Sequence, residues 1–72
     1  MARELSKRER MSLALKGQAL EDGSYPIPDL AHLRSAIKLA RGGHGDVAAA
    51  KRLILRRARE LGAERELPEA WK

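Results

Sequence analysis

The sequence contains no cysteine and no phenylalanine, and it has only one tryptophan and one tyrosine. Without cysteine, a disulfide framework and a thiolate metal site are both excluded, and the absence agrees with a reducing compartment. Tyr25 and Trp71 are the only aromatic side chains. Two rings so far apart, each needed for packing, leave no platform on which single-stranded bases could stack.

Long apolar runs are also missing. No stretch approaches the roughly 20 apolar residues that a membrane span needs. Residues 1–15 carry charges but lack the apolar region and small-residue cleavage site of a secretory signal. We therefore expect no membrane partner and a cytoplasmic location. A chain of 72 residues is enough for one domain with a modest core.

Positive charge is in excess, with 15 Lys and Arg against 10 Asp and Glu, a formal charge of +5. The excess is greatest in residues 46–61, which contain five cations and two acids, a net charge of +3. A basic chain with a basic helix favours polyanionic partners. Solubility is the alternative explanation, because small soluble domains often carry charges of this size.

The strongest local pattern begins at Asp46 and ends at Gly62. Asp46 is a good N-cap and Gly62 fits the left-handed position that follows a helix. Between them, apolar residues recur at helical spacing and predict a core-facing stripe, with Lys51 and Arg57 at its flanks. The stripe consists of Val47, Ala50, Ile54, Ala58 and Leu61, with Leu53 at its edge.

A second helix is predicted from Leu30 to Arg41, capped by Asp29. The loop of four residues at 42–45 predicts that the two helices pack as an antiparallel αα-hairpin. In residues 1–16, Ser6 and Glu9 form a capping-box pattern, so we expect a helix or partly ordered arm that ends at Gly17.

Residues 18–28 are irregular. Asp22 and Gly23 indicate a turn, and the prolines that follow Tyr25 and Ile27 predict extended backbone at both residues, with room for a very short strand. We expect both side chains to point inward and Trp71 in the C-terminal tail to fold back. The predicted fold is mainly all-α: a small three-helix domain with a helical hairpin in residues 17–72 and a short extended segment.

Signs of catalysis or metal binding are absent. His32 and His44 have no neighbours in sequence that would complete a metal site. Residues 43–48 match a G-x-G-x-x-A pattern, but a helix precedes them where a dinucleotide fold needs a strand. No paired carboxylates or nucleophile motif occur. The sequence therefore predicts a protein that is not an enzyme and has no cofactor.

Basic residues form rows on both predicted helices, and these rows are the candidate nucleic-acid site. Together they could contact several phosphates, which predicts weak sequence specificity and strong salt dependence. Base reading looks poor, because the start of the second helix of the pair is Val47-Ala48-Ala49-Ala50. The candidate residues are Arg34, Lys38, Arg41, Lys51, Arg52, Arg56 and Arg59.

Three alternatives remain open at this level. The cationic surface could dock an acidic protein surface, or it could be an ordinary solvated face with ion pairs to Glu60 and the C-terminal acids. The N-terminal helix could also form a homodimer.

Several segments together resemble a small helical domain of unknown function that is common in actinobacteriophages. The resemblance spans residues 17–72 and rests on Asp22-Gly23-Ser24-Tyr25-Pro26-Ile27, then Ala50-Lys51-Arg52, Ile54, Arg57-Ala58 and Leu61-Gly62. Glu21 stands where such domains would have proline, and the loop at 42–45 varies among them. Domains of this kind occur alone or appended to phage head proteins such as prohead proteases. The resemblance implies a non-catalytic module in the cytoplasm of a bacterial host, acting in head assembly or as a small effector on a host protein.

Overall fold

The computed structural model describes residues 5–71. It contains three α-helices, α1 (Lys7–Leu15), α2 (Leu30–Arg41) and α3 (Val47–Glu60), followed by the short 3-10 helices η1 (Glu64–Glu66) and η2 (Glu69–Trp71). No strand occurs in that range. The prediction of a small, mainly all-α domain is confirmed. The part of the N-terminal helix prediction that concerns residues 1–4 lies outside the described residues.

The helices begin and end where local chemistry favours it. Ser6 and Glu9 form the predicted capping box, with N–O distances of 3.2 and 3.3 Å. The Asp29 carboxylate accepts from the His32 N–H at 2.9 Å, and Asp46 accepts from the Ala49 N–H at 3.1 Å. These side chains satisfy N–H groups that have no partner in the first turn. Gly17 and Gly62 follow the ends of α1 and α3 with φ of 75° and 66°, as predicted.

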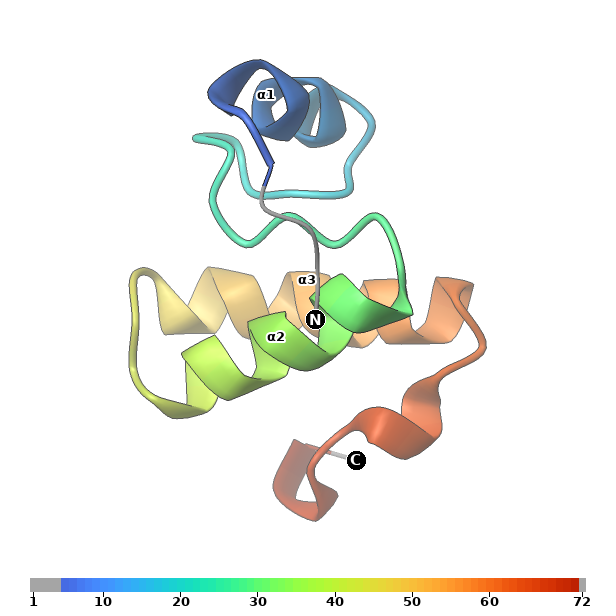
Figure 1. The fold of residues 1–72 in the computed structure, drawn as a ribbon. Coiled ribbons are helices and arrows are strands. Elements are labelled where there is room, and N and C mark those ends of the chain that lie inside the picture. The colour runs from blue at the N-terminus through green and yellow to red at the C-terminus, as the bar shows by residue number, and fades with distance from the viewer. Residues whose placement is uncertain (1–4, 72) are drawn as a thin grey trace.

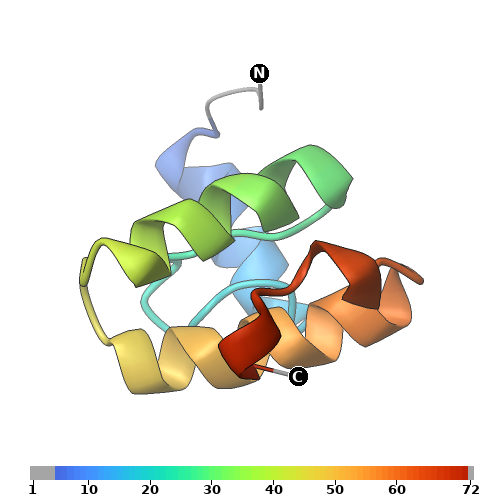
Figure 2. The ribbon, with the colours of Figure 1, turned by 90° about the horizontal axis from the view of Figure 1, so that it is seen from below.

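The core lies between α2 and α3, which run in opposite directions (Figures 1 and 2). Leu33, Ile54 and Ile27 of the preceding segment are its largest fully buried side chains. Each contributes about 1.5–3 kcal/mol of stability when removed from water. The alanines of both helices are small enough to let the two backbones approach closely. The buried hydrophobic residues of the two helices are Leu33, Ala36, Ile37, Ala40, Ala50, Leu53, Ile54 and Ala58.

Other parts of the chain cover this helix pair on two sides. α1 and the segment that follows it lie on one side, and the C-terminal tail lies on the other (Figure 1). Seen from below, the tail lies in front of the helix pair and α1 lies behind it (Figure 2). Leu67 in the tail is buried, and Trp71 packs partly buried against the core. α1 contains no buried residue. The helix pair is thus the middle layer of the domain.

The segment between α1 and α2 departs from its prediction at Tyr25. Tyr25 and Ile27 do point inward, with exposed fractions of 6% and 0%. The predicted extended backbone at Tyr25 is wrong, because its φ is 52°, in the left-handed region. Its hydroxyl donates to the His44 carbonyl, and its ring packs beside Gly45. These distant contacts outweigh the local preference that Pro26 imposes.

Backbone hydrogen bonds close the same segment without forming a strand. The Leu20 N–H donates to the Ser24 carbonyl at 2.9 Å, and the Ile27 N–H donates to the Gln18 carbonyl at 2.7 Å. Gly23 has a φ of 84°, which fits the predicted turn. The Asp22 carboxylate accepts from both the N–H and the hydroxyl of Ser24. The pairing holds Ile27 in the core.

Candidate nucleic-acid interface

The predicted basic row of α2 lies on the solvent side of that helix. Arg34, Lys38 and Arg41 are all exposed. Arg34 is engaged, because its Nε donates to the Glu66 carboxylate of η1. Lys38 and Arg41 have no ionic partner or side-chain hydrogen bond to any residue from 5 to 71. Two cations of this row therefore remain available to an external anion.

The predicted cations of α3 also include some with a partner inside the protein and some without one. Arg52 and Arg59 are exposed, and neither forms an ion pair or side-chain hydrogen bond within residues 5–71. Arg56 donates through Nη2 to the Gly17 carbonyl and so joins α3 to the end of α1. Lys51 is half-buried, with its Nζ 5.5 Å from the centroid of the Trp71 ring, within cation–π range.

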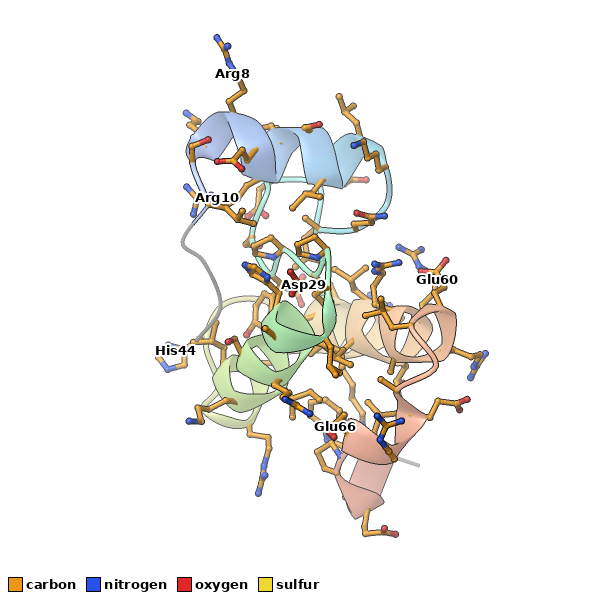
Figure 3. All side chains as sticks on the ribbon, turned by 45° about the vertical axis from the view of Figure 1, so that its right-hand side comes forward. Arg8, Arg10, Asp29, His44, Glu60 and Glu66 are labelled. Atoms are coloured by element: carbon orange, nitrogen blue, oxygen red, sulfur yellow. The ribbon has the colours of Figure 1, made fainter. Side chains whose placement is uncertain are left out.

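The two rows do not form one continuous surface. Arg34 contacts the tail, which lies on one side of the helix pair, whereas Arg56 contacts the segment on the opposite side (Figures 1 and 3). Within α3, the i, i+7 spacing of Arg52 and Arg59 places them on one face. Spacing along each helix thus groups Lys38 with Arg41 and Arg52 with Arg59, although Arg52 and Arg59 line different hollows.

Carboxylates lie close to part of the α3 row. A surface hollow is lined by Arg52 and Arg56 together with Glu21, Asp22 and Asp46. Hydrogen bonds from Ser24 lower the pKa of Asp22 and keep it ionised. The positive potential around Arg52 and Arg56 is therefore weaker than the helix sequence alone suggests. Arg59 lies elsewhere, in a second hollow that Leu55 and residues of the tail also line.

Arg57 has a role that the sequence did not indicate. Predicted at the flank of the apolar stripe, it is buried, and its Nε donates to the Ile27 carbonyl at 2.8 Å. Its Nη1 donates to Glu60 at 3.0 Å, and its Nη2 lies 3.5 Å from the Pro28 carbonyl. All three acceptors are protein groups, so this arginine stabilises the fold and does not face a ligand.

A second group of cations was not among the predicted site residues. Lys7, Arg8, Arg10 and Lys16 belong to α1 or its C-cap, and all are exposed. Within residues 5–71, none of these four forms an ion pair or a side-chain hydrogen bond. Figure 3 shows Arg8 directed away from the rest of the molecule. The apolar residues of α1 fit neither a helical nor a strand spacing clearly, so the sequence did not predict which of its side chains face solvent.

Neither histidine belongs to a metal-binding cluster within residues 5–71. His32 is buried, and its Nδ1 lies 2.7 Å from Asp29 Oδ1, whereas His44 is exposed in the loop between α2 and α3. Across residues 5–71, no three His, Asp or Glu side chains gather closely enough to hold a metal ion. Nor does any helix in that range combine the length and apolar character needed to cross a membrane.

No protein-family model, curated protein or solved structure matches this chain.

Proposed function

We propose that this protein binds the phosphate backbone of double-stranded nucleic acid through exposed cations of α2 and α3. The proposal is carried by one observation. Lys38, Arg41, Arg52 and Arg59 are exposed and have no carboxylate or carbonyl partner among residues 5–71. The net charge of +5 acts in the same direction. Cations that are not neutralised within the fold can release counterions from a nucleic acid when they contact it.

The chemistry of the surface favours backbone contacts over base reading. The first turn of α3 presents valine and alanines, which cannot form bidentate contacts with base edges. A duplex fits better than a single strand, because Tyr25 is buried and Trp71 is covered by Lys51. We therefore expect weak sequence specificity. In a phage setting, which the sequence resemblance implies, this site would act in the cytoplasm of a bacterial host.

The test is a salt titration of binding to a short DNA duplex. Changing Arg52 and Arg59 to alanine together should weaken binding equally for unrelated sequences. It should also reduce the slope of log affinity against log salt by about 1.8, because each phosphate contact contributes about 0.9. The matched control is the double change Arg34→Ala with Arg65→Ala. It removes the same charge but takes away arginines that already donate to Glu66 and to the Gly62 carbonyl.

The control should weaken binding clearly less than the Arg52 and Arg59 pair. Equal losses would mean that only net charge matters and would contradict a local site. Affinity that does not change with salt would contradict phosphate binding altogether.

A further inference from the structure

The side of α1 that faces away from the helix pair has an unusual composition. Leu15, the last residue of α1, is 91% exposed, and Met11, whose sulfur packs beside Gly23, is 40% exposed at the edge of this side. Helical spacing places Arg8 and Ser12 on the same side, and Lys16 adjoins them at the C-cap. We name this set, Arg8, Met11, Ser12, Leu15 and Lys16, the outer α1 face. The face combines two exposed apolar side chains, Met11 and Leu15, with two cations, Arg8 and Lys16.

This face is held in a defined position. The capping box fixes the start of α1. At the other end, the Gln18 N–H donates to the Leu13 carbonyl at 2.8 Å, and Arg56 donates to the carbonyl of Gly17. Leu15 is therefore presented by an ordered helix end. Because the backbone that carries Leu15 is already ordered, binding at this residue costs little backbone freedom.

We propose that the outer α1 face docks an acidic, amphipathic segment of another protein. Charge complementarity identifies this occupant. The outer α1 face carries Arg8 and Lys16 and no acid, and Lys7 lies one helical turn from Met11 at its edge. Acidic side chains of the partner would pair with these cations, and an apolar side chain would cover Leu15 and Met11. The arrangement matches the apolar centre and polar rim of known protein interfaces.

Three other occupants fit less well. A second copy of the chain would bring the cations of α1 against one another, which is unfavourable. Phosphates of a nucleic acid would pair with the cations but leave Leu15 uncovered. A lipid surface needs a broad apolar stripe on one side of the helix. Here Leu13 and Leu15 point to different sides, because Leu13 is half-buried while Leu15 is exposed. The surface is also separate from the α2 and α3 cations of the proposed function.

The experiment is an NMR titration of the isotope-labelled full chain with a designed helical peptide. The probe carries leucines at i and i+4 among glutamates, and a second peptide has lysines in place of the glutamates. The acidic peptide should shift the amide resonances of α1, and the basic peptide should not. Leu15→Ser should weaken binding of the acidic peptide about tenfold or more. Leu39→Ser is the matched control, because Leu39 is an exposed leucine on α2.

Each outcome decides the proposal. Leu15 is so exposed that its replacement should leave the melting temperature unchanged, and a melting curve of each variant verifies this. No shifts with the acidic peptide, equal binding of both peptides, or equal losses from the two leucine changes would overturn the proposal. Two further results would do the same: a concentration-dependent dimer that Leu15→Ser dissociates, or α1 shifts that only a DNA duplex produces.

Discussion

Arg57 joins α3 to the segment that precedes α2. It is buried at 7% exposure, yet its guanidinium donates to the carbonyl of Ile27, the central side chain of the core. A guanidinium suits this position because its planar fork can address several acceptors at once. Its ion pair with Glu60 adds less, since the Glu60 side chain is 52% exposed and water screens the attraction. The backbone carbonyls are the important partners.

We expect Arg57→Ala to lower the free energy of unfolding by about 2–3 kcal/mol, because it leaves buried carbonyls without a donor. Arg57→Lys should restore only part of this loss, since an ammonium cannot reproduce the fork. Arg59→Ala is the control, and it should change the value by less than about 0.5 kcal/mol because Arg59 is exposed. Urea denaturation measures all three. Equal effects of the two alanine changes would contradict this account of Arg57.

At the scale of the element, the start of α2 links helix stability to pH. Asp29 accepts a hydrogen bond from the backbone N–H of His32, and the His32 ring lies 2.7 Å from the same oxygen. The backbone bond is the largest of the causes that lower the pKa of Asp29 from its ordinary value of 3.8, and the hydrogen bond to the His32 ring is the next largest. The folded state therefore favours the ionised carboxylate.

Because the folded pKa lies below the unfolded one, the contribution of Asp29 is complete above the unfolded value. It is lost as the pH falls through the folded value. Asp29→Asn keeps an N-cap acceptor but removes the titration. We expect the stability difference between the wild type and this variant to shrink from about pH 6 to about pH 2, as measured by thermal unfolding. The pKa of Asp22 is also lowered, and the variant Asp22→Asn measures the contribution of Asp22 to the pH dependence of stability. A difference that is constant across this range would contradict the linkage.

At the scale of the whole molecule, the two outer layers differ in how they are attached to the helix pair. The tail inserts Ala63 and Leu67 into the core, with exposed fractions of 2% and 7%. α1 buries no residue, and its Leu13 is only half-buried. The tail is thus part of the core, whereas α1 is a structured appendage on the segment beneath it.

Deleting residues 1–15 should lower the free energy of unfolding by less than about 1.5 kcal/mol, because residues 5–15 include no buried side chain. Leu67→Ala should lower it by about 2–4 kcal/mol through loss of burial and the cavity left behind. Both variants should still unfold cooperatively in urea. A deletion that costs more than Leu67→Ala would show that α1 belongs to the cooperative core.

The sequence by itself determined the bounds of α2 and the N-caps at Ser6, Asp29 and Asp46. It also determined which faces of α2 and α3 are buried, and it placed Arg34, Lys38, Arg41, Arg52, Arg56 and Arg59 on exposed positions. These features depend on side chains within about one helical turn of one another, so local periodicity and capping chemistry are sufficient to fix them.

Only the tertiary structure decided the left-handed backbone of Tyr25, the burial of Arg57 and the separation of the two basic rows. It also decided which predicted site residues have internal partners. Arg34 reaches Glu66 across 32 positions, and Arg56 reaches Gly17 across 39. Contacts over such separations depend on how whole elements pack, and no local pattern encodes them. The periodicity of α3 placed its arginines on an exposed face. The packing of the segments around α3 decided that Arg56 donates to the Gly17 carbonyl, whereas Arg52 and Arg59 have no partner within residues 5–71.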